Sequence, residues 1–148
     1  MQCPFCSPDV IKHQTIFESE KFWLLYNHKP MLPGHSLIIP KRHVDTLLEL
    51  SDDELREFAV FAKHVAAALM AAYGCDGIDM SIQNGRTAGA SVDHIHWHIV
   101  PRREGDIEGD PSMWMSKIIE SERSRQPISN DEVNANAKKI RDAMAKIA

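Results

Sequence analysis

Three histidines alternate with apolar residues in the run His94-Ile95-His96-Trp97-His98-Ile99-Val100. Successive side chains of an extended strand point to opposite faces, so the run predicts a strand over 92–100 with the three imidazoles on one face. At about 3.3–3.4 Å per residue the outer two lie about 13 Å apart along the backbone and reach one metal ion poorly. Imidazole serves as nucleophile, general base or general acid near neutral pH, so we expect separate roles. A solvated, histidine-rich face without chemistry is the alternative.

The other elements follow from hydrophobic periodicity and capping signals. Ser51 and Glu54 form a capping box, apolar residues then recur at helical spacing, and Gly74 is a helix stop, so a helix is predicted over 52–73. Strands are expected around 15–17, 22–26, 35–40 and 78–83, and further helical segments over 112–121 and after a second capping box at 129–132. This order predicts one α+β domain with a mainly antiparallel sheet, one long helix and a C-terminal helical extension.

Charge and hydropathy exclude several classes of function. The chain has 17 Lys and Arg against 21 Asp and Glu, a net charge of −4, which disfavours binding of long nucleic acids. A small anionic ligand held by a few placed groups remains open. The longest apolar run, 65–73, is far shorter than the roughly 18 residues of a membrane span. The first residues have no basic and apolar regions of a signal peptide, so a cytoplasmic protein with no membrane partner is expected.

A second motif lies at the N-terminus, where Cys3 and Cys6 are three residues apart in Cys-Pro-Phe-Cys. Three cysteines in the whole chain cannot make a disulfide framework, so the pair indicates metal or redox chemistry, or simply free thiols. A redox motif of this kind normally follows a strand and opens a helix, a context that this pair lacks. A metal site would need two further ligands in a tetrahedral set.

Taken together, these motifs resemble the histidine-triad (HIT) nucleotide hydrolases and transferases. The likeness covers most of residues 3–106, so that residues 1–148 are expected to form a single HIT domain with an extension over about 107–148. Within the family the layout is most similar to the Fhit-like dinucleoside polyphosphate hydrolases. The matching blocks are Cys3–Cys6, Asn27 with Lys29-Pro30, Pro33-Gly34-His35, Pro40–His43, Gln83–Gly85, Ala88-Gly89, Ser91 and the triad with Pro101-Arg102.

The resemblance implies hydrolysis at the α-phosphate of dinucleoside polyphosphates or of nucleotide conjugates such as phosphoramidates. The middle histidine of the triad, His96, would be the nucleophile and would form a nucleotidyl-histidine that water cleaves to release a nucleoside monophosphate. His98 would assist the leaving group and His35 would support the site. The matched substrate-binding positions are Gln83 and Ser91 for phosphate and Asn27 for ribose. The family also implies a homodimer.

Two further expectations come from the resemblance. Some members bind a structural zinc ion through an N-terminal cysteine pair and two histidines, and the matching positions here are Cys3, Cys6, His43 and His94. His64, on the long helix, is the rival of His43. Many members also carry Gln four residues before the first triad histidine, where this chain has Ala90. Alanine cannot donate a hydrogen bond, so slower or differently selective hydrolysis is expected. A nucleotide-binding or sensing protein with little turnover is the alternative.

Overall fold

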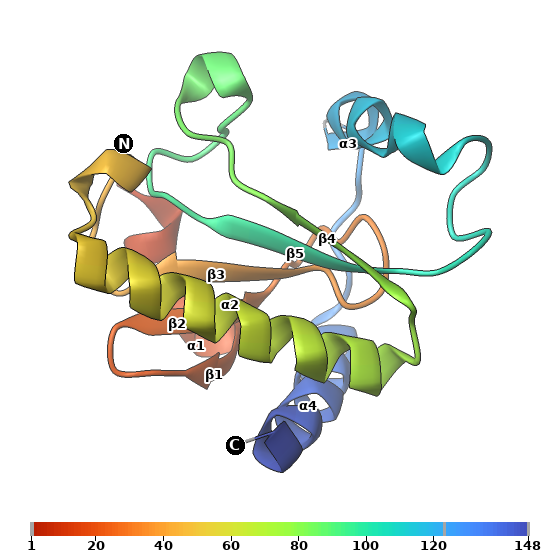
Figure 1. The fold of residues 1–148 in the computed structure, drawn as a ribbon, viewed down its shortest axis with the longest axis horizontal. Coiled ribbons are helices and arrows are strands. Elements are labelled where there is room, and N and C mark those ends of the chain that lie inside the picture. The colour runs from red at the N-terminus through yellow and green to blue at the C-terminus, as the bar shows by residue number, and fades with distance from the viewer. Residues whose placement is uncertain (1, 123, 148) are drawn as a thin grey trace.

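The computed structural model describes residues 2–122 and 124–147. Its centre is a five-stranded antiparallel sheet with the order β1-β2-β3-β5-β4 (Figure 1). The strands are β1 (Thr15–Glu18), β2 (Phe22–Tyr26), β3 (Ser36–Pro40), β4 (Gly77–Ser81) and β5 (Trp97–Arg102). The predicted α+β class with an antiparallel sheet is confirmed.

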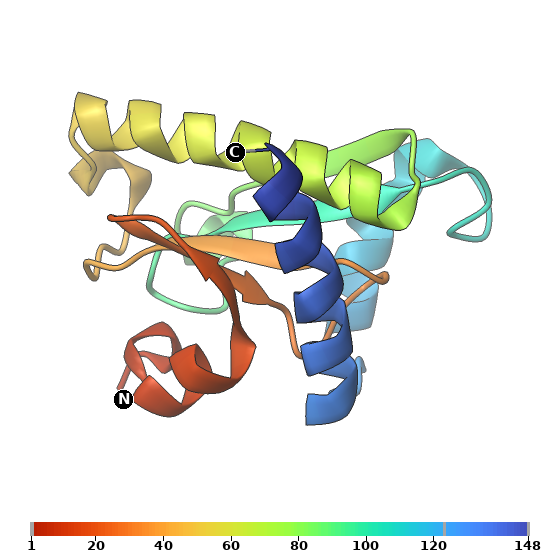
Figure 2. The same ribbon diagram turned by 90° about the horizontal axis from the view of Figure 1, so that it is seen from below.

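Helices lie on both faces of this sheet. They are α1 (Pro8–Gln14), α2 (Asp52–Tyr73), α3 (Trp114–Glu122) and α4 (Asn130–Ile147), with short 3-10 turns η1 (Pro4–Cys6), η2 (Leu47–Glu49), η3 (Arg86–Ala88) and η4 (Pro111–Met113). The long helix α2 covers one face, and α1 and α3 lie on the other (Figure 2). No helix of the described ranges is long and apolar enough to cross a membrane.

Helix α2 has the bounds that the sequence predicts, because local signals define both ends. The Ser51 hydroxyl accepts from the Glu54 N–H at 3.1 Å, and the Glu54 carboxylate accepts from the Ser51 N–H at 2.8 Å. The helix stops at Gly74, whose φ of 58° is left-handed and therefore favours glycine. The capping box of α4 also forms, since the Ser129 hydroxyl accepts from the Glu132 N–H at 3.2 Å.

The main core lies between α2, α4 and the sheet. Phe58 of α2 stacks on Phe22 of β2 at a centroid distance of 4.9 Å and meets the Trp97 ring edge-to-face at 5.2 Å. Trp97 therefore faces α2, on the side of the sheet opposite α3, as the alternation predicts. The C-terminal extension joins this core through Val133, Ala137, Ile140, Ala143 and Met144 of α4, all of them buried.

The predicted strand over 92–100 is wrong at its start, because β5 begins at Trp97 and runs to Arg102. Its partner β3 ends at Pro40, which lacks an N–H, so the pairing stops at Ile38 opposite Trp97. Ile95, which precedes His96, does not pair with β3. Its N–H donates instead to the Val44 carbonyl at 2.8 Å. Only His98 of the three histidines lies within the strand, while His94 and His96 precede it.

Two smaller differences concern the first helix and β4. The sequence reading missed α1, which has only seven residues and begins with Pro8 after Ser7. Proline is favoured at the first helical position, so Ser7-Pro8-Asp9 was the available signal. Strand β4 ends at Ser81 rather than at residue 83.

Candidate active site and metal site

His96 is held by a backbone carbonyl. Its Nδ1 lies 2.8 Å from the carbonyl oxygen of His94, which only accepts hydrogen bonds, so Nδ1 carries the proton and the lone pair is on Nε2. The side chain is 4% exposed, and the Phe5 ring meets the imidazole edge-to-face at 5.1 Å. This arrangement gives an oriented imidazole with a nucleophilic nitrogen.

His35 and His98 form a second oriented pair. The Met31 N–H donates to Nδ1 of His35 at 3.1 Å, so the neutral His35 ring carries its proton on Nε2. This Nε2 lies 3.0 Å from Nδ1 of His98 and donates to it. The His98 proton is therefore on Nε2. The pairing of Leu37 on β3 with His98 on β5 brings the two elements together.

Burial keeps both rings of this pair neutral. Loss of solvent, with smaller contributions from the positive charge of Arg125 and from His96, lowers the pKa of His35 to about 3. Burial likewise lowers the pKa of His98 to about 2, with smaller contributions from His96, His35 and Arg125. At neutral pH the site thus contains uncharged imidazoles with fixed tautomers.

A cavity of about 270 Å³ opens beside His96 and His98. Two of the predicted substrate-binding residues, Asn27 and Ser91, line it as well. The Asn27 side chain is fixed, because its Oδ1 accepts from the Lys29 N–H at 3.0 Å. The remaining lining is Pro4, Phe5, Val10, Gln14, His28, Lys29, Leu37, Val92 and Arg125.

The chemistry of this lining suits an anionic ligand with an apolar part. Among the described lining residues there are two cations, Lys29 and Arg125, and no carboxylate. Phe5, Val10 and Leu37 supply the apolar wall. The sequence reading missed these five as site residues. Phe5 and Val10 had a weak signal, since Phe5 lies between the two cysteines and Val10 follows them, whereas Arg125 is 27 positions beyond His98 and gave none.

Gln83, the third predicted substrate-binding residue, is not among the described residues that line this cavity. It follows β4 and lies beside Gly89, where a Cβ would be 3.6 Å from the Gln83 Cγ. Its proposed contact with phosphate stays a prediction.

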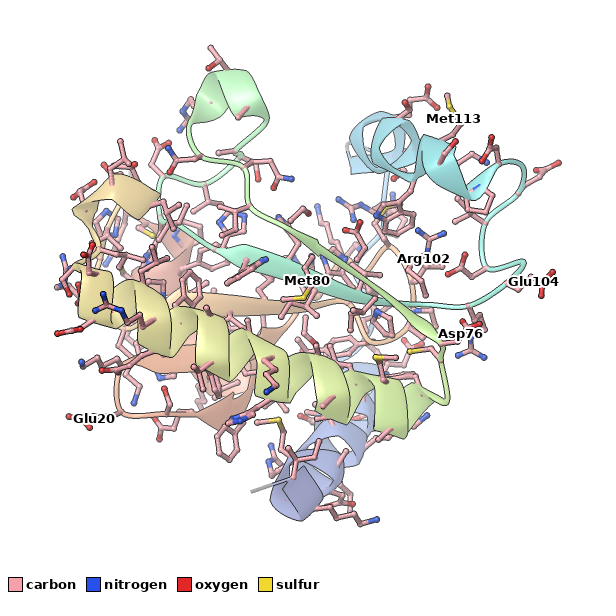
Figure 3. All side chains as sticks on the ribbon, viewed as in Figure 1. Glu20, Asp76, Met80, Arg102, Glu104 and Met113 are labelled. Carbon is pink, nitrogen blue, oxygen red and sulfur yellow. The ribbon has the colours of Figure 1, made fainter. Side chains whose placement is uncertain are left out.

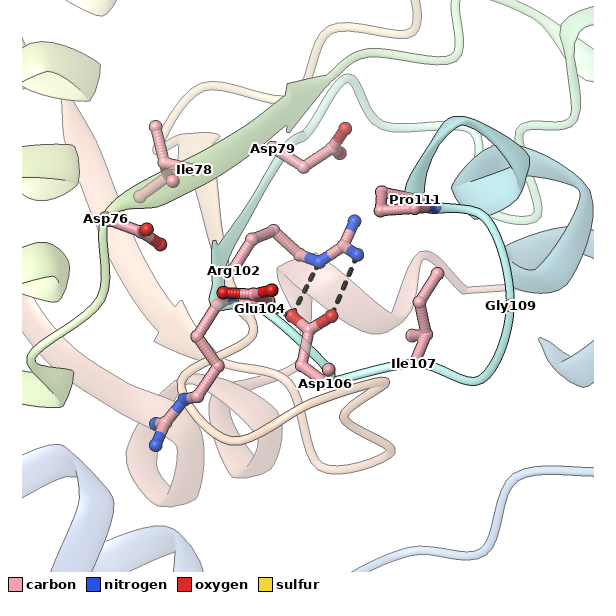
Figure 4. Close-up of a pocket in the computed structure, with 12 residues that line it drawn as sticks. Asp76, Ile78, Asp79, Arg102, Glu104, Asp106, Ile107, Gly109 and Pro111 are labelled. Atoms are coloured by element: carbon pink, nitrogen blue, oxygen red, sulfur yellow. Dashed lines mark hydrogen bonds and ion pairs between the residues drawn. The ribbon is translucent and has the colours of Figure 1, made fainter.

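A larger cavity, of about 710 Å³, lies at the other end of β4 and β5 (Figure 4). Four carboxylates line it, from Asp76, Asp79, Glu104 and Asp106. Arg102 is already occupied there, because Asp106 accepts from its Nε and Nη2 at 2.7 and 2.9 Å and its guanidinium lies 3.9 Å from the Trp114 ring centre. Arg103 also lines it, but the four carboxylates outnumber the two arginines, so this lining suits an anionic ligand less well than the smaller cavity does.

A second cluster joins the predicted metal ligands Cys3, Cys6, His43 and His94, whose ligand atoms all lie within 4.8 Å of one another. Nδ1 of His94 is 3.5 Å from the Cys3 Sγ and 3.6 Å from the Cys6 Sγ. Nδ1 of His43 is 3.3 Å from the Cys6 Sγ. Tetrahedral zinc with bonds of about 2.0–2.3 Å places neighbouring ligands about 3.3–3.8 Å apart, and these three separations fall within that range, so the cluster could hold a metal ion.

Outer hydrogen bonds orient both histidines of this cluster. Nε2 of His94 lies 2.9 Å from the Pro40 carbonyl, and Nε2 of His43 lies 2.9 Å from the Asp45 carboxylate. These acceptors hold the protons on Nε2 and leave the Nδ1 electron pairs facing the two thiols. Carboxylate and carbonyl partners of this kind are typical of zinc-binding histidines. His64 lies elsewhere, exposed on α2, so His43 completes the cluster.

Comparison with known proteins agrees with this fold. The HIT domain family model matches residues 9–105, and the chain therefore belongs to the HIT family. A bis(5'-adenosyl)-triphosphatase of Dictyostelium discoideum is 32% identical over 142 residues, which are 95% of this chain and 93% of that protein. A bis(5'-adenosyl)-triphosphatase of Saccharomyces cerevisiae is 35% identical over 72% of this chain and 52% of its own length.

Two solved structures are similar over almost the whole chain. A hypothetical histidine triad nucleotide-binding protein from Sulfolobus tokodaii has a TM-score of 0.78 and 29% identity, covering 97% of this chain and 93% of that one. A zinc-bound histidine triad family protein from Mycobacterium smegmatis has a TM-score of 0.74 and 27% identity, covering 99% and 95%.

Proposed function

We propose that this chain is a nucleotide hydrolase that cleaves dinucleoside polyphosphates, or nucleotide conjugates such as phosphoramidates, at the α-phosphate. The observation that carries the proposal is the fixed tautomer of His96, with Nδ1 held by the His94 carbonyl, together with the position of His96 and His98 in the lining of one cavity. The similarity to triphosphatases that act on bis(5'-adenosyl) compounds supports this substrate class.

The mechanism begins with attack of His96 Nε2 on the α-phosphorus. A phosphorus–nitrogen bond forms, and the bond from phosphorus to the leaving group breaks. The His94 carbonyl accepts from Nδ1–H of His96 at 2.8 Å and stabilises the positive charge that develops on the ring. His98 donates its Nε2–H to the departing atom, which is oxygen in a polyphosphate and nitrogen in a phosphoramidate. Water then cleaves the nucleotidyl-histidine and releases the nucleoside monophosphate.

The substrate-binding residues act before and during this step. Asn27, whose Oδ1 accepts from the Lys29 N–H, is proposed to contact the ribose, and Ser91 and Gln83 are proposed to contact phosphate. The apolar wall of Phe5, Val10 and Leu37 is suited to the flat face of a base. Holding the α-phosphate against His96 is what converts binding into catalysis.

The assay is incubation with diadenosine triphosphate and with an adenosine phosphoramidate, followed by chromatography of the products. We expect AMP release by the wild-type protein and none above background from His96→Asn. The alternative, a binding or sensing protein, is favoured only by Ala90. Tight nucleotide binding without release of AMP would favour that alternative.

We also propose that Cys3, Cys6, His43 and His94 hold a structural zinc ion. Four protein ligands close the coordination sphere, so the ion would not touch substrate. It would tie the N-terminus to His94, two residues before the nucleophile, and so fix the backbone carbonyl that orients His96. The zinc-bound relative from Mycobacterium smegmatis supports this assignment.

The homodimer expected from the family has a candidate surface at β4. The other edge strand, β1, is covered, because α4 packs on it and Arg141 Nε donates to the Ile16 carbonyl at 2.9 Å. Strand β4 pairs only with β5 among the described strands, and its Met80 is exposed (Figure 3). We propose that two copies meet along β4. We also propose a cytoplasmic location, because a reducing compartment keeps cysteines in the reduced form that binds zinc.

A further inference from the structure

Arg125 brings a permanent cation into the triad cavity from the C-terminal part of the chain. It lies between α3 and α4, and its N–H donates to the Ser121 carbonyl at 3.0 Å. The side chain is half-buried and lines the cavity together with Ser91, His96 and His98. A residue distant in sequence is thus placed beside the reacting groups.

The positive charge of Arg125 acts on the imidazoles of His35 and His98. Arg125 lowers the pKa of both His35 and His98, which places the guanidinium within electrostatic reach of each ring. The second cation of the lining, Lys29, is exposed, whereas Arg125 is half-buried and therefore less screened by solvent. Of the two, Arg125 is the cation whose field is stronger at the site of phosphorus chemistry.

A negatively charged phosphate chain is stabilised by a cation in the cavity. A dinucleoside polyphosphate carries several negative charges, and the chain itself has a net charge of −4. The imidazoles of the pair are neutral, so they donate hydrogen bonds but supply no positive charge. Guanidinium presents several donors in a plane that matches phosphate oxygens, which makes arginine suited to this task.

We propose that Arg125 is a catalytic residue that contacts the phosphate chain of the substrate and stabilises the negative charge at the phosphorus attacked by His96. This inference rests on the proposed function. It predicts that Arg125 recognises phosphate specifically and contributes nothing to recognition of the nucleoside.

The test compares AMP with adenosine as ligands for the wild-type protein, Arg125→Gln and Arg125→Lys, by isothermal titration calorimetry. We expect Arg125→Gln to weaken AMP binding about 10- to 100-fold, the range for a charge-assisted hydrogen bond, and to change adenosine binding less than about twofold. Arg125→Lys keeps the charge and should restore part of the loss. The same order should hold for kcat/KM with diadenosine triphosphate.

Arg56→Gln is the matched control, because Arg56 is exposed on α2, outside the triad cavity, and its guanidinium pairs with Asp53 at 2.6 Å. It should bind both ligands as the wild type does. Equal weakening of AMP and adenosine by Arg125→Gln would show a structural role, and no weakening of either would show no role; each overturns the proposal. AMP-specific weakening in a protein that does not release AMP would support the phosphate contact while rejecting hydrolysis. Wild-type protein that binds no AMP would overturn both.

Discussion

Nε2 of His35 donates a hydrogen bond to Nδ1 of His98 across 3.0 Å. The direction of this bond is fixed from outside the pair, since the Met31 N–H occupies Nδ1 of His35. One backbone N–H thus sets the tautomer of two rings in series and leaves the Nε2–H of His98 for substrate. His35 is therefore a positioning residue for His98.

Removing His35 should slow catalysis without abolishing it. His35→Phe deletes the donor to Nδ1 of His98, so the His98 ring loses its fixed tautomer and orientation. We expect kcat to fall about 10- to 100-fold, the usual cost of losing an orienting partner, with a smaller change in KM. Steady-state kinetics with diadenosine triphosphate measures both. His64→Gln, a change at an exposed position of α2, should leave both constants unchanged. A wild-type kcat in His35→Phe would contradict the role.

Acid should destabilise the fold through the same pair. The folded-state pKa values of His35, about 3, and His98, about 2, lie below the ordinary value of 6.5. The unfolded chain therefore binds more protons, and the free energy of unfolding falls as pH drops below about 6.5, by up to about 1.4 kcal/mol per pH unit for each ring. Urea unfolding at pH 7, 6 and 5 measures this slope. His98→Asn should reduce this slope by up to about 1.4 kcal/mol per pH unit, the contribution of one ring. An unchanged slope would contradict a lowered pKa of His98 in the folded state.

Zinc should copurify with the protein at about one equivalent. Cys6→Ser removes a ligand of the Cys3, Cys6, His43 and His94 cluster, so it should lose the metal and lower Tm, because metal bound only by the folded state adds to stability. Cys75→Ser is the control, since Cys75 lies outside the cluster and should keep the metal. Elemental analysis of the three proteins decides. Less than about one-tenth equivalent in the wild type would reject a zinc site.

Ala90→Gln tests the expected effect of the missing amide. Glutamine four residues before His94 would add a hydrogen-bond donor near the phosphate or leaving group, so we expect faster hydrolysis or a shifted preference among leaving groups. Rates with diadenosine triphosphate, diadenosine tetraphosphate and a phosphoramidate measure this. Ala90→Ser is a smaller control. If neither rate nor preference changes, Ala90 does not limit the enzyme.

Helix α4 should contribute strongly to stability although it lies in the extension. Ile140 is fully buried in the main core, so Ile140→Ala should lower the free energy of unfolding by about 2–5 kcal/mol. Chemical denaturation measures it. Lys138→Ala, on the same helix, is the control, because Lys138 is exposed and pairs with Asp142 only at the surface. A loss below about 0.5 kcal/mol at Ile140 would show that α4 is not part of the cooperative core.

Local signals predicted the elements whose ends are defined by neighbouring residues. The capping box of Ser51 and Glu54 and the stop at Gly74 were sufficient for α2, because their hydrogen bonds are made within the helix itself. The start of β5 was not predictable in this way. Its first residue is set by the end of β3 at Pro40, which is a property of the partner strand and not of residues 92–96.

The site residues likewise divide into those that local sequence patterns indicated and those that depend on distant parts of the chain. The alternating histidines and the cysteine pair indicated chemistry, and the resemblance to a family assigned the individual roles. Arg125 could not be found, because its position in the cavity depends on the path of the chain through α3. The two adjoining sites meet at His94, whose ring faces the thiols and whose carbonyl orients His96. That double role follows from the backbone of residues 94–96, which pattern alone did not reveal.

The covalent intermediate on His96 tests the central claim most directly. The measurement is rapid acid quenching of the protein mixed with diadenosine triphosphate, or base quenching where the adduct is acid-labile, followed by mass spectrometry of the intact chain and its peptides. We predict a single adenylyl group on the peptide that contains His96 and no adduct on His96→Asn. Release of AMP at the wild-type rate by His96→Asn, or an adduct on a different residue, would contradict the account.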